Sequence, residues 1–234
     1  MTGWRLETWG GMRVLPVMAA PAEYGAHLRV RIQPLMTGIG PVEAAVVLTK
    51  ALAELAVREE TPALVLSLGS CGSPTLDHAA VYQASSVAYR DMDASPLGFE
   101  RGVTPLLDMP AVVALPCPIQ DVPTATLSTG GNVISGAAYD AIDADMVDME
   151  TWALMRACRT FEVPLVALRG VSDGRAELKV LTDWTSTLHH VDENLARAVD
   201  ALIAILETRG PSALETHAVD GKDAARIAEP EPTP

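Results

Sequence analysis

The chain has 234 residues, 49% of them hydrophobic and 20% charged, which is enough to bury one substantial core. Its formal net charge of -13 would repel nucleic acid and anionic membrane surfaces, so we expect neither as a partner. The cysteines, Cys71, Cys117 and Cys158, include no C-x-x-C pair, which argues against a disulfide framework or a zinc site and favours a reducing cytoplasm. The N-terminal segment lacks the order of a secretory signal, and no apolar run reaches the roughly 18 residues of a membrane span.

Apolar runs typical of strands alternate with patterns typical of helices along the chain. The expected helices carry apolar residues at three- and four-residue spacing. Such alternation predicts an α/β fold in which helices pack around a sheet. Strands are expected at 12–20, 29–40, 62–73, 79–91, 124–136 and 164–172, and helices at 42–59, 151–161 and 192–209.

Residues 1–209 are expected to form a single domain. From Gly210 onward the sequence loses its periodicity and gains proline and charge. This composition predicts a flexible polar tail over residues 210–234.

Several loops follow the predicted strands. In α/β sheets, ligands bind outside the carboxyl ends of the strands, where such loops converge. We therefore expect a ligand site there. The loops are "TGIGP" (37–41), "GSCGSP" (69–74), "STGGN" (128–132), "DMET" (148–151) and "SDG" (172–174). The glycines of "TGIGP" allow backbone amides to approach a ligand, but the third glycine of a dinucleotide fingerprint is missing, so a structural turn remains an alternative.

Asp148 and Glu150 flank Met149 where a predicted strand ends. In extended chain, residues two apart project from the same face, so the two carboxylates would share one wall. The structural alternative is capping of the following helix by Glu150 or Thr151, which would leave Asp148 without a role.

Asp173 follows the predicted strand 164–172 and precedes Gly174. It is suited to a helix cap or an Asp-Gly turn. A carboxyl held at the end of a buried strand also has its charged form disfavoured by desolvation, which raises its pKa and suits it to donate a proton. Asp173 is therefore a candidate general acid.

The sequence does not favour serine-hydrolase or metal chemistry. Ser70 directly follows Gly69, so the G-x-S-x-G frame is absent, and no motif marks a histidine as its base. The adjacent His189 and His190 stand near a helix start, where a solvated or capping role is favoured over metal ligation. We expect neither a metal nor a cofactor.

Taken together, five segments resemble the nucleoside phosphorylase and hydrolase superfamily, and within it the methylthioadenosine/S-adenosylhomocysteine nucleosidases most. The resemblance spans roughly residues 13–205, and its specific part is a V-(E/D)-M-E motif followed by R-x-(I/V)-S-D. The segments are "TGIGPVEAA", "LSLGSCGSP", "YRDMDASPLGFERG", "STGGNVISG" and "VDMETWALMRACRTFEVPLVALRGVSD".

The resemblance implies a three-layer α/β/α sandwich with a mixed central β-sheet, and a homodimer. It also implies hydrolysis of the N-glycosidic bond between adenine and a 5′-alkylthio ribose, so the expected partner is a small purine nucleoside. Asp173 resembles the acid that protonates N7 of the leaving adenine, with Ser172 in support, and Glu23 resembles the carboxylate that activates water. The implied substrate contacts are Glu150 and Asp148 at the ribose, Met149 against the sugar, Ser70 near the water or ribose, the Val133 backbone at the adenine edge, and Phe99 of the neighbouring subunit at the 5′-alkylthio group.

The sequence departs from the family pattern at three places. Glutamate is common where Asp148 stands, so a contact of that side chain must shift. The base loop reads "GGNVI" where G-D-x-F is common, which removes an acid and an aromatic surface. Glu23 stands alone where several acids are common, so its assignment depends on spacing.

Two other functions remain open. Phosphorylases of this superfamily hold phosphate with an early loop of the G-D-P-x-R type, because a dianion needs cationic donors. "AAPAEYG" has no such arginine, which favours hydrolysis, but Arg90 and Arg29 or Arg31 keep a phosphate-dependent phosphorylase as an alternative. A non-catalytic nucleoside-binding protein on the same fold is the second alternative, although such a protein would need no proton donor.

Overall fold

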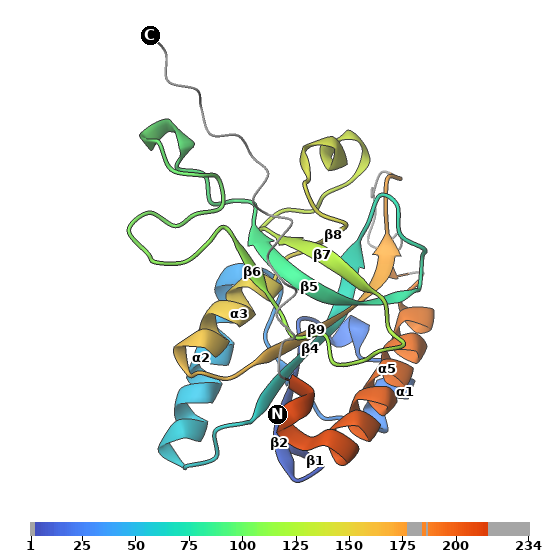
Figure 1. The fold of residues 1–234 in the computed structure, drawn as a ribbon. Coiled ribbons are helices and arrows are strands. Elements are labelled where there is room, and N and C mark those ends of the chain that lie inside the picture. The colour runs from blue at the N-terminus through green and yellow to red at the C-terminus, as the bar shows by residue number, and fades with distance from the viewer. Residues whose placement is uncertain (1–2, 177–183, 186, 215–234) are drawn as a thin grey trace.

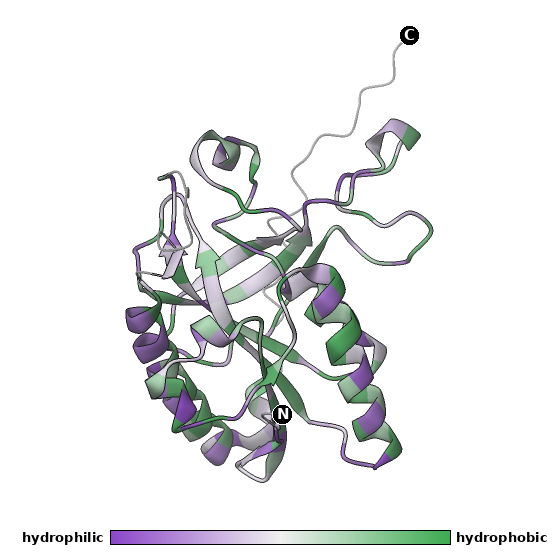
Figure 2. Cartoon of the chain, turned by 180° about the vertical axis from the view of Figure 1, so that it is seen from behind, coloured by the Kyte–Doolittle hydropathy of each residue, from purple (hydrophilic) through white to green (hydrophobic). Residues whose placement is uncertain are grey.

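Apolar runs form the strands of one mixed sheet in the computed structural model, which describes residues 3–176, 184–185 and 187–214. Figure 2 shows hydrophobic residues along the central strands and a mixture of hydrophobic and hydrophilic residues along the helices. The strands are β1 (Glu7–Trp9), β2 (Met12–Met18), β3 (Leu35–Met36), β4 (Leu64–Gly72), β5 (Val81–Tyr89), β6 (Val112–Ala114), β7 (Thr124–Thr129), β8 (Met146–Asp148) and β9 (Leu165–Asp173).

Five of the strands close into a ring. β4 pairs in parallel with β9, β9 pairs antiparallel with β5, and β5 pairs in parallel with β7. β7 then pairs in parallel with β8, and β8 returns antiparallel to β4, where Gly72 lies opposite Val147. Gly72 is also paired with Asp173 of β9. The closure therefore brings the ends of β4, β8 and β9 to one place, and the prediction of a mixed sheet is confirmed.

Helices cover both faces of this sheet (Figure 1). One core contains residues of α2 (Pro41–Val57) and α3 (Thr151–Thr160), and the other contains residues of α1 (Ala26–Arg29) and α5 (Leu188–Arg209). Leu48 and Leu52 of α2 and Leu195 and Leu202 of α5 are fully buried, and each contributes about 2 kcal/mol by leaving water. The predicted three-layer arrangement is confirmed.

The start of α2 leaves one backbone amide without a partner inside the helix. Pro41 occupies the first turn, where its missing N–H costs nothing, and Gly40 precedes it with φ of 98°. That backbone angle is in the region that favours glycine. The Gly40 N–H therefore has no partner within the helix and is free to bind a side chain of another element.

Short 3-10 helices interrupt the loops. They are η1 (Pro21–Glu23), η2 (Ser95–Leu97), η3 (Gly136–Ala141) and η4 (Gly210–Leu214). Residues 210–214 were expected in the tail, but they form η4 and bury Ala213 against the core that contains α5. Residues 215–234, the rest of the predicted tail, lie outside the described residues.

The predicted strand over residues 29–40 is wrong for most of its length. Its start belongs to α1 and to a turn, and only Leu35–Met36 pair as β3. The carboxylate of Asp192 on α5 accepts hydrogen bonds from the N–H groups of Gly25, His27 and Leu28, which stabilises the first turn of α1. Within the described part of the chain, no helix combines the length and apolarity that a bilayer crossing requires.

Candidate active site

A cavity of about 550 Å³ opens at the ends of β4, β8 and β9. Each of the five loops predicted to converge contributes to its wall, so that prediction is confirmed. The lining residues are Ala19, Ala20, Glu23, Ile39, Ser70, Cys71, Gly72, Arg90, Asn132, Val133, Ile134, Val147, Asp148, Met149, Glu150, Asp173 and Trp184.

Glu23 lies on the cavity wall beside Ser70. Its Oε1 accepts hydrogen bonds from the Ser70 backbone N–H at 2.6 Å and from the Ser70 hydroxyl at 2.7 Å. Its Oε2 is buried and has no hydrogen-bond partner among the described residues. Burial raises the pKa of Glu23, and the two hydrogen bonds from Ser70 oppose that shift. One oxygen of this carboxylate is therefore fixed, and the other is available as a proton acceptor.

Asp173 ends β9 and lines the same cavity. The Ser172 hydroxyl donates to Asp173 Oδ2 at 2.7 Å. Gly72 makes room for this carboxyl, because a Cβ at that position would lie 2.7 Å from Asp173 Oδ1 and would collide with the buried Tyr139 hydroxyl. Desolvation raises the pKa of Asp173, opposed by the Ser172 hydrogen bond and the nearby His78. The predicted rise in pKa at the end of a buried strand is confirmed.

Glu150 borders the cavity at the seam between β8 and α3. Its Oε1 accepts a hydrogen bond from the Gly40 N–H at 2.8 Å. Burial, together with the nearby charge of Asp148, raises the pKa of Glu150 to about 7. Glu150 occupies the N-cap position of α3 but makes no side-chain capping bond. Its carboxylate is therefore directed to the cavity and not to the helix.

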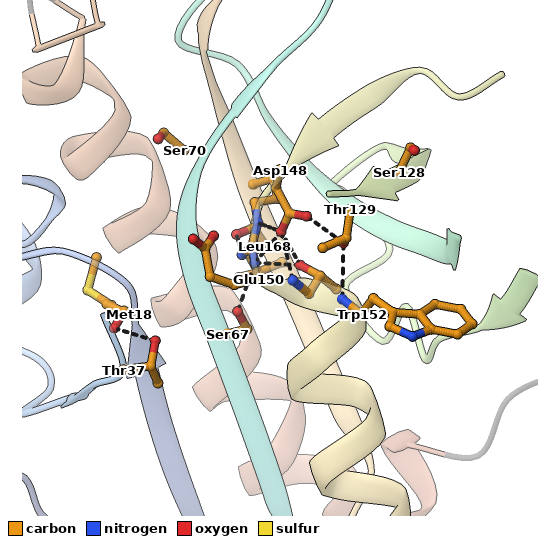
Figure 3. Close-up of polar contacts among 12 residues, drawn as sticks. Met18, Thr37, Ser67, Ser70, Ser128, Thr129, Asp148, Glu150, Trp152 and Leu168 are labelled. Atoms are coloured by element: carbon orange, nitrogen blue, oxygen red, sulfur yellow. Dashed lines mark hydrogen bonds and ion pairs between the residues drawn. The ribbon is translucent and has the colours of Figure 1, made fainter. Parts of the chain in front are cut away.

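Asp148 caps the start of α3, a role that the sequence had suggested for Glu150 or Thr151. Its Oδ2 accepts from the Thr151 N–H at 3.0 Å, at the start of α3, and also from the Thr151 hydroxyl. Arg169 donates to the same oxygen, and Thr129 donates to Oδ1 at 2.6 Å. Figure 3 shows the dashed lines that gather at Asp148, with the Glu150 side chain beside them. The expectation that Asp148 would be left over from capping is wrong, because this carboxylate makes the contact to the helix start.

The other predicted contact residues fall into two groups. Met149 and Val133 line the cavity, and Val133 is 64% exposed. Phe99 is half-buried, does not line this cavity, and follows η2 in a loop that extends from the body of the molecule (Figure 1). Its predicted place in a neighbouring subunit stays a prediction.

Sequence reasoning missed two residues of the site. Trp184 lines the cavity and donates from Nε1 to the Ser70 hydroxyl at 2.9 Å, although no periodic pattern marked it. Arg169 lies fully buried in β9. The sequence feature that could have revealed it is a single charged residue within an apolar strand. Arg169 also donates to Ser67 at 3.0 Å, which ties β9 to β4 beneath the cavity.

The arginines considered for phosphate are engaged elsewhere. Arg31 pairs with Asp200 at 2.7 Å, and Arg29 donates to the Tyr24 carbonyl at 3.0 Å. Arg90 lines the cavity, but its terminal nitrogens donate to four backbone carbonyls, those of Ser128, Gly130, Asn132 and Asp148. Among the described lining residues Arg90 is the one cation, and only its buried Nε lacks a partner.

His189 and His190 lie at the start of α5, with their ring centroids 5.6 Å apart and His27 beside His189. Across residues 3–176, 184–185 and 187–214, no group of three His, Cys, Asp or Glu side chains is arranged to hold a metal ion.

An α/β fold with three acids around one cavity is suited to acid–base chemistry on a small ligand. The family model of the phosphorylase superfamily matches residues 23–207. The chain belongs to the phosphorylase superfamily, and the resemblance of its motifs to that superfamily is confirmed.

Individual relatives agree with this assignment. A 5′-methylthioadenosine/S-adenosylhomocysteine nucleosidase of Staphylococcus aureus (strain MRSA252) is 28% identical over 193 residues, which cover 73% of this chain and 80% of the relative. Futalosine hydrolase of Helicobacter pylori strain 26695 shares the fold with a TM-score of 0.68 at 16% identity, over 82% of this chain and 97% of that one. A Neisseria meningitidis 5′-methylthioadenosine/S-adenosylhomocysteine nucleosidase in complex with methylthio-immucillin-A shares it with a TM-score of 0.68 at 20% identity, over 83% and 98%.

Proposed function

We propose that this protein is a nucleosidase that hydrolyses the N-glycosidic bond of 5′-methylthioadenosine or S-adenosylhomocysteine and releases adenine. The observation that carries the proposal is the placement of three acids around one cavity of about 550 Å³: Glu23 at the end of η1, Glu150 before α3 and Asp173 at the end of β9. A cavity of this size suits a small organic ligand. The name of the Staphylococcus aureus relative supports the choice of substrate.

Asp173 and Glu23 carry out the two proton transfers. Asp173, whose pKa is raised by desolvation, gives its proton to N7 of adenine while the bond between C1′ and N9 breaks and its electron pair moves to the base. A water molecule then forms the new bond to C1′ and loses its proton to Glu23, whose Oε2 has no other partner among the described residues. This is the division of work between paired carboxyls in glycosidases, applied to an N-glycoside.

The remaining lining residues hold the ribose and the base. Glu150 accepts hydrogen bonds from the ribose hydroxyls, and its negative charge stabilises the oxocarbenium-like sugar. Met149 packs against the sugar, and the Val133 backbone meets the adenine edge. Ser70 orients Glu23 next to the water. Asp148 is left out of this set, because its oxygens already accept hydrogen bonds from Arg169, Thr129 and Thr151.

Hydrolysis is favoured over phosphorolysis by the charges at the cavity. A phosphate dianion needs paired cationic donors. Arg90 is the one lining cation among the described residues, and carbonyls occupy its terminal nitrogens. The wall near Glu23 is therefore suited to a neutral water and not to a dianion.

The functional unit is proposed to be a cytoplasmic homodimer. Leu97 and Leu106 are 78% and 99% exposed in the loop that carries Phe99, and Val42 and Val46 are exposed on α2. Apolar side chains of this kind are typical of a surface that another protein covers. In the dimer, Phe99 of the second subunit would face the 5′-alkylthio group. Sedimentation equilibrium of the purified chain tests this, and a monomer at micromolar concentration would contradict it.

Product analysis in isotopically labelled water distinguishes the three possible functions. We expect adenine and a free 5′-alkylthio ribose that carries the label at C1′, without any need for phosphate. A sugar phosphate formed only when phosphate is added would identify a phosphorylase. Tight binding of nucleosides without turnover of any of them would identify a binding protein.

A further inference from the structure

We propose that Trp184 is a positioning residue that sets the orientation of Ser70, and through Ser70 the proton affinity of Glu23. The inference rests on the proposed function and adds to it a residue outside the segments that carry the three acids. It concerns one hydrogen-bonded chain, which runs from an indole through a hydroxyl to a carboxylate.

The chain is continuous and lies on the cavity wall. Nε1 of Trp184 donates to the Ser70 hydroxyl at 2.9 Å, and that hydroxyl donates to Glu23 Oε1 at 2.7 Å. The Ser70 backbone N–H donates to the same Oε1 at 2.6 Å. All three residues line the cavity of about 550 Å³. Trp184 is thus two hydrogen bonds away from the carboxylate.

The residue types fix the direction of this chain. An indole N–H can only donate, and an ionised carboxylate can only accept. A serine hydroxyl has one hydrogen to give, so when Trp184 donates to its oxygen, that hydrogen is directed to Glu23. Without the indole donor, the hydroxyl is free to rotate toward other acceptors. Phenylalanine at this position would keep an aromatic ring but lose the donor.

The orientation matters because Glu23 is buried. Burial raises its pKa, whereas the proposed role as a base requires the ionised form. The Ser70 hydrogen bond favours that form, and a donor to Ser70 strengthens it, because hydrogen bonds in a chain polarise one another. Arg169 of β9 also favours the ionised form of Glu23, and the charge of Glu23 in turn raises the pKa of Glu150 and of Cys71.

The chain also selects which oxygen of Glu23 is reactive. Oε1 holds both hydrogen bonds from Ser70, whereas Oε2 is buried and has none among the described residues. An unpartnered buried oxygen is costly, and a bound water that donates to it removes that cost. Trp184 therefore contributes by holding the Ser70 hydroxyl on Oε1, which leaves Oε2 as the oxygen that can accept from the water.

The first test compares Trp184→Phe with Ser70→Ala and the double variant in the full chain. Trp184→Phe should lower kcat for methylthioadenosine about fivefold, the effect of one hydrogen bond, and leave KM within about twofold. The acid limb of its rate profile should move to higher pH. Because both changes break the same chain, the double variant should be no slower than Ser70→Ala. Trp4→Phe, a half-buried tryptophan outside the cavity, is the matched control.

A second readout does not depend on turnover. Selective carbon labelling of the glutamate carboxyls allows Glu23 to be titrated by NMR, with Glu23→Gln to assign its signal. Its pKa should be higher in Trp184→Phe than in the wild type, and Trp184→His, which keeps an N–H donor, should lie between them. An unchanged pKa, or kcat effects that multiply in the double variant, would overturn the inference. If the wild type is inactive but the pKa of Glu23 changes as expected, the proposed function is refuted and the hydrogen-bonded link from Trp184 through Ser70 to Glu23 is supported.

Discussion

Arg169 donates two hydrogen bonds to Oδ2 of Asp148, from Nε at 3.1 Å and from one terminal nitrogen at 3.0 Å, and the two side chains are 3% and 1% exposed. The pair joins β9 to the end of β8, and Asp148 also accepts a hydrogen bond from the Thr151 N–H at the start of α3. A buried ion pair of this kind is strongly destabilising when one partner is removed, because the remaining charge has no water around it. The ion pair between Arg169 and Asp148 therefore stabilises the segment that carries Glu150, the proposed ribose contact.

Removing the carboxylate of Asp148 should destabilise the fold. Asp148→Ala leaves Arg169 buried and unpaired, so the free energy of unfolding should fall by about 3–5 kcal/mol in urea denaturation. Asp140→Asn is the matched control, because Asp140 pairs with Arg175 on the surface, where the side chains are 67% and 56% exposed. That control should change little, and equal losses in the two variants would contradict the structural role of Asp148.

The ionisation of Glu150 should make stability depend on pH. Its pKa is raised from 4.5 to about 7 in the folded chain, so the folded state binds more protons than the unfolded state between those values. Stability contributed by the protonated form is therefore lost as pH rises from about 5 to about 8. Glu150→Gln removes this dependence, and its stability relative to the wild type should increase across that range. If the urea midpoints of the wild type and of Glu150→Gln differed by the same amount at all pH values, that result would contradict the raised pKa of Glu150.

Asp173→Asn should lose its activity as a general acid. We expect kcat to fall about a hundredfold or more, because the amide cannot protonate the leaving base. In the wild type, activity should decline as pH rises through the raised pKa of Asp173, since only the acid form donates. Binding of adenine, followed by calorimetry, should persist in the variant. Turnover close to that of the wild type would remove Asp173 from the mechanism.

Glu23→Gln should block the attack of water and spare the binding of the nucleoside. The amide still accepts hydrogen bonds from Ser70, so the local geometry is retained, but it cannot take a proton. Calorimetric titration with methylthioadenosine should give an affinity near that of the wild type while adenine release stops. Lost binding together with intact chemistry would reverse the role assigned to Glu23.

Much of the fold was predictable because local pattern decides it. The apolar spacing of α2 and α5 and the strand runs of β4 and β9 are confirmed within a few residues. The segment 29–40 was misjudged because the cap on α1 comes from Asp192, far along the chain. The closure of the sheet from β8 back to β4 also depends on pairing between distant residues, which periodicity cannot reveal.

The residues of the candidate site were likewise predictable only in part. The acids at 150 and 173 stand in recognisable motifs, Glu23 was assigned by spacing, and all three line the cavity. The exchange of roles between Asp148 and Glu150 could not be predicted, because a buried partner from β9 decides it and spacing alone places both acids on one face. Trp184 was missed for a related reason, since its hydrogen bond to Ser70 spans a long stretch of sequence with no motif around it.

Adenine release from 5′-methylthioadenosine by the purified chain in phosphate-free buffer tests the central claim most directly. We expect adenine and free methylthioribose in equal amounts, with release almost abolished in Asp173→Asn and Glu23→Gln. Release that requires added phosphate, or no release by a folded chain that binds the nucleoside, would contradict it.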